Sequence, residues 1–324
     1  MSDQLKTRKA SDLEAAQGSN DAIYPVQPPK KIKFEPCMLL QMFNALLILN
    51  LKTHHPSENQ HLFEDLFNGE IDELDEAIKY SIVAHGNFWS SFGYALLEKA
   101  VEGGLTKVVK LLLKHADAGI AIFINEGRQL LPSCMHGYIE IAQLLLEHGA
   151  DPNLLGEGRF SDKTCLSVAC AEGNSSLVAL LLKYAANPNF CCPPRAVPLL
   201  LDVISNSKID IVKLLLEHGA DANKTRPGCF APIGSACFYG SLKAAELLLD
   251  HGADINAVDK DGDTPLILAI RGRRPGRDLV QLLLERGADI SLLNNEGCTA
   301  LQYTEKGSEL AQMLTYAQTE SILK

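Results

Sequence analysis

An apolar phrase returns along this chain at a nearly constant interval. Three consecutive leucines are followed by one or two polar residues and then by small residues, as in the stretch LLLEHGADPN at 144–153. The leucine triplets begin at residues 111, 144, 180, 214, 247 and 282, so successive steps measure 33 to 36 residues. A period of this size predicts a solenoid of stacked units, each of which buries its apolar face against its neighbours.

A second phrase stands before each triplet and predicts a second helix in every unit. It is clearest at 261–270, where Asp261 and Gly262 suit a turn, Thr264 suits a helix cap and Pro265 suits the first helical turn. A glycine or small residue seven positions before a triplet is expected to end this first helix; these residues are Gly104, Gly137, Gly173, Ser207 and Gly240. The Gly-Ala-Asp group then ends the second helix, and a hairpin-like finger leads to the next unit.

These phrases resemble the ankyrin repeat family, whose Thr-Pro-Leu opening, glycine between helices and Leu-Leu…Gly-Ala-Asp ending are all present. The resemblance covers residues 61–324 and implies an all-α solenoid with short β-hairpin-like fingers and about eight stacked helix-turn-helix units. Departures from the family pattern affect loops: Arg128-Gln129-Leu130 and 197–199 replace Thr-Pro-Leu, and extra residues stand at 156–163 and 273–277.

Both ends of the predicted array are degenerate, as expected of capping units. Residues 61–78 have the apolar pattern of two short helices, and Gly69 stands 35 positions before Gly104. We therefore expect the first unit here. The last unit opens at 298–301, and Thr315 takes the place of a middle leucine. A polar residue at that position suits a helix that no further unit covers.

The first 34 residues differ from the array. Residues 1–34 carry 6 basic and 4 acidic side chains with scattered apolar ones, a composition that predicts a disordered tail. Within this tail, Lys30, Lys31 and Lys33 follow two prolines and resemble a short nuclear localisation signal. A solvated linker explains the same lysines, so we expect a cytoplasmic protein, with nuclear import as the alternative.

Residues 35–60 are predicted to form an apolar helical N-terminal extension. In 37–51, 12 of 15 residues are apolar, but the run is too short to span a bilayer and no cleavage motif follows it. Two interpretations remain open. The helix either packs on the first unit or exposes an apolar face to a partner, as docking helices do.

Composition narrows the class of function. The chain has 324 residues with 30 basic against 40 acidic side chains, and its net charge of −10 is the wrong sign for wrapping nucleic acid. No apolar stretch has the length of a membrane span. The nine cysteines include no C-x-x-C pair, which favours a reducing cytosolic or nuclear compartment.

Catalytic signatures are missing from the sequence. It has no phosphate-binding glycine loop, no zinc-protease motif and no serine-hydrolase elbow. Four histidines share one repeat position near a helix end, where an imidazole can satisfy backbone groups; they are His115, His148, His218 and His251. We therefore expect no enzyme, metal or cofactor. The alternative is an enzyme with a site in the first 90 residues, for which Cys37 and His54 are the residues that can be named.

The resemblance implies that a partner binds finger tips and first helices, which line a concave face. Residues that deviate from the repeat are the candidates, because binding residues need not recur. Arginines and aromatic or large side chains gather at such positions and are the types that dominate binding hot spots. The candidates are Met135, His136, Arg159, Phe160, Phe190, Arg195, Arg226, Phe230, Phe238 and Tyr239. The alternative is that some of these rings pack against their own fingers.

The sequence thus predicts a non-enzymatic scaffold, monomeric by itself, that binds another protein through the concave face. The alternative is an adapter, either a ubiquitin-ligase substrate receptor or a protein resembling bacterial effectors. In that hypothesis residues 35–60 recruit machinery while the repeats select the client. The repeated residues form the core, so they do not identify the partner.

Overall fold

The computed structural model describes residues 75, 78, 79, 82, 93–116, 119–126, 129–192, 197–226 and 228–322. The predicted tail at 1–34 with Lys30, Lys31 and Lys33, the predicted extension at 35–60 and most of the first unit lie outside the described residues. The side chains of Arg159, Cys192 and residues 320–322 are likewise not described.

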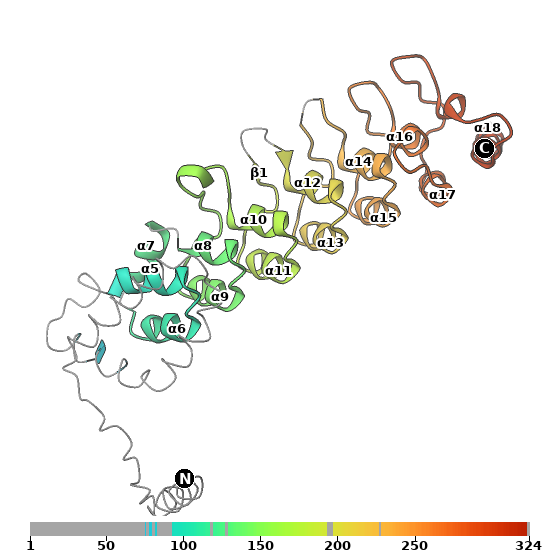
Figure 1. Ribbon diagram of the computed structural model, residues 1–324. Helices are drawn as coiled ribbons and strands as arrows, with labels where there is room; N and C mark the ends of the chain where they lie inside the picture. Colours follow the sequence, from blue (N-terminus) through green and yellow to red (C-terminus); the bar gives the residue numbers. More distant parts are fainter. Residues whose placement is uncertain are drawn as a thin grey trace, which may run out of the picture. The chain divides into compact units, whose positions relative to one another are not determined.

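Seven helix pairs follow one another within 93–322 (Figure 1). The first helices are α5 (Tyr94–Glu102), α8 (Leu130–Met135), α10 (Cys165–Glu172), α12 (Leu199–Ser205), α14 (Pro232–Tyr239), α16 (Pro265–Arg271) and the 3-10 helix η3 (Ala300–Tyr303). The second helices are α6 (Thr106–Lys114), α9 (Ile139–Glu147), α11 (Ser175–Lys183), α13 (Ile209–Glu217), α15 (Leu242–Asp250), α17 (Arg277–Glu285) and α18 (Glu309–Ile322).

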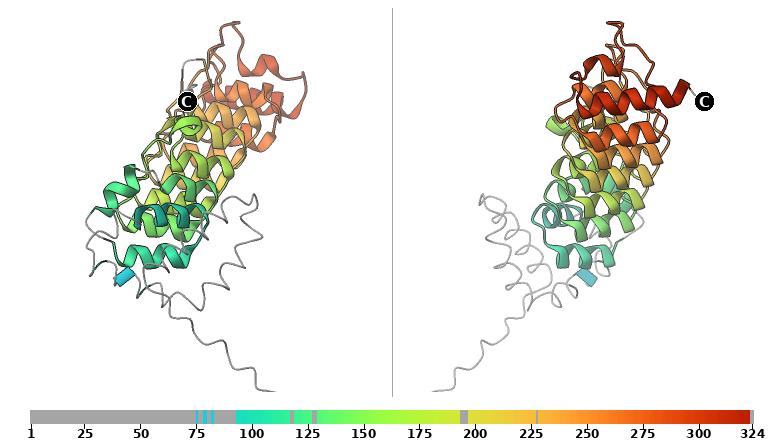
Figure 2. Two further views of the ribbon diagram at one scale, coloured as in Figure 1. Left: turned by 60° about the vertical axis from the view of Figure 1, so that its left-hand side comes forward. Right: turned by 90° about the vertical axis from the view of Figure 1, so that its right-hand side faces the viewer.

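The helices stack in chain order and form two rows. Each first helix contacts the first helix of the next unit, from α5 to η3, and each second helix contacts the next second helix, from α6 to α18. The rows lie side by side in Figures 1 and 2, with the fingers extending beyond the row of first helices. The predicted all-α solenoid of stacked helix pairs is confirmed.

Leucine burial holds the two rows together. The middle leucine of every triplet is 0 % exposed, namely Leu112, Leu145, Leu181, Leu215, Leu248 and Leu283. Burying one such side chain contributes about 1.5–3 kcal/mol. In α18 the corresponding Thr315 is exposed, and its hydroxyl donates to the Ala311 carbonyl at 2.7 Å. Its exposure agrees with the expectation that a polar residue here suits a helix that no further unit covers.

Caps fix where the helices begin and end. Thr264 Oγ1 accepts a hydrogen bond from the Ile267 backbone N–H at 3.3 Å, and Pro265 occupies the first turn of α16, both as predicted. Left-handed residues end most first helices, with φ between 69° and 77° at Gly104, Gly137, Gly173 and Gly240. Ser207 adopts the same conformation with φ 57°, a strained choice for a residue with a side chain.

Gly272 departs from the expected glycine turn. Its φ of −66° and ψ of −177° are extended and not left-handed, because the extra residues after it lengthen the turn between α16 and α17. A Cβ atom here would lie 2.5 Å from the Phe238 carbonyl oxygen and 2.6 Å from that of Leu268. The position therefore requires glycine because two backbones approach closely.

The fingers are more varied than the sequence predicts. The finger before α8 contains an additional helix, α7 (Ile120–Glu126), and the finger before α10 contains the 3-10 helix η2 (Gly158–Phe160). In the next finger, β1 (Cys191–Cys192) pairs antiparallel with β2 (Val197–Pro198). Across the described residues this is the one paired hairpin, so the other fingers depend on turns and side-chain hydrogen bonds.

Asparagine side chains join each finger to the next. Asn189 Nδ2 donates to the Gly219 carbonyl at 2.9 Å, and its Oδ1 accepts from the Asp221 N–H at 2.8 Å. Asn125, Asn153 and Asn223 make the same two bonds to the unit that follows them. We call this series the asparagine ladder. Residues predicted only to form turns therefore also connect successive units.

Candidate partner-binding site

The candidate residues at the end of α8 form a small exposed surface. Met135 is half-buried against the core, whereas His136 is exposed and its ring stacks on Tyr138 with centroids 5.4 Å apart. Tyr138 in turn lies against Gly104 of the preceding unit, and burial raises the pKa of its phenol. His136 is the member of this group with the most accessible ring.

The candidate aromatics of the two fingers before α10 and α12 lie partly in the core. Phe160 and Phe190 are half-buried and pack against buried residues. The Lys163 ammonium lies 5.9 Å from the centroid of the Phe160 ring. Arg195 lies outside the described residues, and of Arg159 only the backbone is described. Whether these two arginines contact a partner stays a prediction.

The structure brings three candidate aromatics together at α14, and we call Phe230, Phe238 and Tyr239 the aromatic strip. Phe238 and Tyr239 end the helix, and Phe230 belongs to the finger just before it. The Phe230 and Phe238 rings lie 5.1 Å apart, and Phe238 meets Tyr239 edge-on at 5.4 Å. Gly234 stands four residues from each phenylalanine along the chain. A Cβ on it would lie 3.0 Å from Leu268 Cδ1 of the next unit and 3.6 Å from Phe230 Cβ, so the close approach here is to α16.

A residue of the next unit completes the strip. The guanidinium carbon of Arg273 lies 5.3 Å from the Tyr239 ring centroid and 5.8 Å from that of Phe238. These distances are typical of cation–π contacts. Sequence reasoning missed Arg273, although the lengthened turn that carries it was visible as the stretch RGRRPGR. The fourth candidate of this region, Arg226, is half-buried in the preceding finger.

Backbone contacts fix the position of Arg273. Its N–H donates to the Phe238 carbonyl at 2.8 Å and so satisfies one of the unpaired carbonyls at the end of α14. Arg274 packs directly on Gly240, where a Cβ would lie 2.6 Å from the Arg274 Cβ. Two glycines, Gly240 and Gly272, thus allow the α16–α17 turn to rest on the end of α14.

The four arginines of this turn differ in their partners. Arg271 forms a 2.7 Å ion pair with the buried Asp263, and Arg277 forms one of 2.6 Å with Glu309. Arg273 and Arg274 are exposed, and neither forms an ion pair with a carboxylate of the described part of the chain. Two cationic side chains therefore remain without a neutralising partner beside the aromatic strip.

Arg271 belongs to a polar network between the last two units. Its guanidinium lies 4.4 Å from the Tyr303 ring centroid, while Asn294 Nδ2 donates to Asp263 Oδ1 at 2.7 Å. Tyr303 Oη donates to Glu296 at 2.6 Å, and this bond raises the pKa of the phenol. The polar atoms of these groups bond to one another, so the network stabilises the interface between the last two units.

The repeated histidines have structural partners. Nδ1 of His148, His218 and His251 lies 2.8–2.9 Å from the carbonyl four residues earlier, as predicted. His115 differs, because its Nε2 lies 2.5 Å from Asp75 and holds the pKa of that carboxyl well below its usual range. Within the described ranges no three His, Cys, Asp or Glu side chains gather as metal ligands do.

The described cysteines do not form a reactive site. Cys134, Cys165, Cys170 and Cys237 are buried and form no disulfide. Burial raises the pKa of the Cys237 thiol, and contact with Cys134 together with burial raises that of Cys165. Such thiols stay protonated and are poor nucleophiles.

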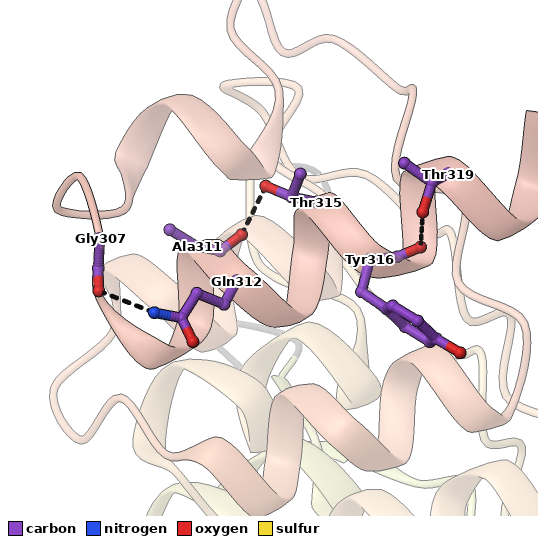
Figure 3. A pocket seen from close by; sticks show the side chains of 6 residues that line it. All are labelled: Gly307, Ala311, Gln312, Thr315, Tyr316 and Thr319. Carbon is purple, nitrogen blue, oxygen red and sulfur yellow. Dashed lines mark hydrogen bonds between the residues drawn. The ribbon is translucent and has the colours of Figure 1, made fainter.

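A shallow hollow on α18 also lacks converging chemistry (Figure 3). It is lined by Gly307, Ala311, Gln312, Thr315, Tyr316 and Thr319. Their hydrogen bonds end within the same segment: Gln312 donates to the Gly307 carbonyl at 3.3 Å and Thr319 to the Tyr316 carbonyl at 2.7 Å. No charged side chain points into the hollow, so it offers no anchor for a ligand.

None of the helices in the described part of the chain has both the length and the apolar character that crossing a bilayer requires.

Comparison with known proteins agrees with this architecture. The family model for three ankyrin repeats matches residues 70–156, 200–294 and 233–322, and the model for a single ankyrin repeat matches 161–192. Together these matches cover most of the chain. The solved human ASB11 ankyrin repeat domain is similar over 68 % of this chain and 96 % of its own, with a TM-score of 0.50 and 25 % identity.

Similarity to curated relatives is local. Ankyrin repeat family A protein 2 of mouse and of human is 48 % identical to this chain over 44 residues. The match spans 14 % of this chain and only 13 % of the relatives. The repeat matches, the ordered stacking of helix pairs and the buried leucine triplets agree, and this chain belongs to the ankyrin repeat family, whose fold is a protein–protein interaction module and generally not a catalytic one.

Proposed function

We propose that the chain is a non-enzymatic scaffold that binds a protein partner on the face lined by its first helices and fingers, with the aromatic strip and Arg273 as the central contact. The observation that supports this is the strip itself. Three half-buried rings touch in a row, and an exposed arginine from the next unit lies over two of them. Tyr, Phe and Arg of this kind supply most of the energy in protein interfaces.

The strip is preferred to the other candidates because its members contact one another. Phe230 and Phe238 pack against the core as Phe160 and Phe190 do, but they also contact each other, whereas His136 stacks on Tyr138, which is not a candidate. The strip therefore offers adjacent ring surfaces and a cation at one place. The finger arginines Arg159 and Arg195 stay predicted contacts.

Rigidity favours binding at this site. The asparagine ladder fixes each finger to the next, and the Arg273 N–H holds the α16–α17 turn on α14. Groups that are ordered before the encounter lose little conformational entropy when a partner arrives. The proposed mechanism is therefore presentation of a preformed surface.

The test is affinity capture from cell extract with the full chain, followed by quantitative mass spectrometry. We expect the double variant Tyr239→Ala, Arg273→Ala to lose specific proteins that the wild type captures. The matched control Tyr316→Ala, Lys306→Ala removes the same kinds of side chain from exposed positions near α18 and should retain them. Equal capture by both variants, with unchanged melting temperatures, would place the binding face elsewhere.

A further inference from the structure

The structure assigns the aromatic strip, together with Arg273 and Arg274, to the recognition of an acidic segment of a partner protein, in which carboxylates meet the two arginines and a neighbouring apolar side chain rests on Phe230 and Phe238. This inference rests on the proposed function and specifies the partner. Four arginines stand within 271–277, and Asp278 is the acidic residue that follows them directly.

Local charge is the first argument. The chain carries a net charge of −10, so most of its surface repels an acidic partner. At this turn, however, Arg271 and Arg277 already have carboxylate partners within the fold, while Arg273 and Arg274 are exposed and without one among the described residues. An acidic segment would therefore be directed to this place.

The geometry of Arg273 is the second argument. Its guanidinium carbon lies 5.3 Å from the Tyr239 ring centroid and 5.8 Å from that of Phe238, and the side chain is exposed. An exposed planar guanidinium can pair with a carboxylate through two parallel hydrogen bonds. The ring contact and the Phe238 hydrogen bond hold the group in place before a carboxylate arrives.

The rings supply the third argument. Phe230 and Phe238 are half-buried, so they keep an apolar surface that continues directly from the cationic end of the site. A partner segment with an acidic residue close to a large apolar one would satisfy both ends. A nucleic-acid strand is disfavoured, because the site offers only two unneutralised arginines to a polyanion on a chain with a net charge of −10.

The experiment is a selection from a random peptide display library on the full chain. The selected peptides are then synthesised, and their affinities are measured for wild type and variants. We expect an excess of Asp and Glu next to Leu or Phe among the selected peptides, and at least a tenfold loss of affinity in Arg273→Gln, Arg274→Gln. The control Lys213→Gln, Lys306→Gln removes the same charge from other exposed positions and should change affinity little.

The outcomes separate the inference from the proposed function. Peptides without an acidic bias that bind the glutamine variant normally but fail on Tyr239→Ala would overturn the acidic partner and leave the binding face intact. Peptides indifferent to both variants would overturn both. If Lys213→Gln, Lys306→Gln lowered peptide affinity as much as the arginine variant does, the loss would reflect net charge alone. If a single-stranded DNA probe bound as tightly as the peptides, with the same dependence on Arg273 and Arg274, the site would be assigned to nucleic acid.

We expect both arginine variants to keep the fold, because the two side chains are exposed and form no ion pair within the described residues. A second pair, Arg273→Lys, Arg274→Lys, keeps the charge but loses the planar fork. We expect intermediate affinity from it, since lysine cannot form the bidentate bond. Full affinity in the lysine pair would contradict the stacked, bidentate geometry.

Discussion

Replacing Leu215 with alanine tests the central packing of the array. Leu215 is the middle leucine of its triplet and is 0 % exposed. Its helix α13 contacts α11, α12 and α15, so packed neighbours on several sides prevent the site from collapsing around a smaller residue. Loss of the buried carbons and the cavity that remains should together reduce the free energy of unfolding by about 2–5 kcal/mol.

The neighbouring Leu214 is the matched control. It is only half-buried, so part of its side chain already contacts water, and Leu214→Ala should cost less than about 2 kcal/mol. Both variants are measured by urea unfolding followed by far-ultraviolet circular dichroism. The slope of each transition shows whether the array still unfolds as one unit, since long repeat arrays can lose that cooperativity.

The reasoning would fail if Leu215→Ala cost under 1 kcal/mol, or if Leu214→Ala cost as much as Leu215→Ala. Either result would mean that the middle leucines do not fill the space between successive second helices. An unchanged unfolding slope with a lowered midpoint is the result that fits the structure.

Four further predictions concern the ladder, the backbone, acid stability and the unassigned segment. Asn189→Ala removes two bonds between units and should cost about 1–2 kcal/mol in the same urea assay, whereas a neutral result would make the ladder incidental. Ser207→Gly relieves a left-handed non-glycine residue and should stabilise the chain by about 0.5–1 kcal/mol; a lower urea midpoint would contradict this. The pKa of Asp75 is lowered in the fold, so ionised Asp75 stabilises the fold fully above the ordinary carboxyl pKa, and this stabilisation is lost as the pH falls through and below that value. Asp75→Asn should therefore make the melting temperature depend less on pH in acid, and an unchanged profile would refute this. If the adapter hypothesis holds, deleting 35–60 abolishes capture of recruited machinery in a pull-down while deleting 1–34 does not; equal capture by both deletions would reject it.

Repetition explains why the fold could be predicted from sequence. Six successive units bury the same leucine, as Leu181 and Leu248 show, so the pattern that builds the core recurs six times at a nearly constant spacing. The additional helix α7 and the extended Gly272 could not be predicted, because each depends on a single irregular segment. Bonds of the asparagine ladder depend on the distance between units, which the pattern within one unit does not specify.

The candidate site was only partly predictable for a related reason. Phe238 and Tyr239 stood out because other units have polar residues there, such as Glu172 before Gly173. That Phe230 reaches them depends on the conformation of the finger before α14, and that Arg273 covers them depends on how a lengthened turn rests on Gly240. Such contacts arise from packing between units and leave no periodic trace in the sequence.

The candidate surface is divided between two units, since its rings belong to α14 and the finger before it and its cation to the turn after α16. It therefore exists only while these two neighbours remain docked. Occupancy and docking are thermodynamically linked: any molecule that bridges the rings and the guanidinium raises the free energy needed to separate the pair, and any weakening of their junction lowers affinity by the same coupling. Local fraying of the C-terminal units would then act as a graded control on binding.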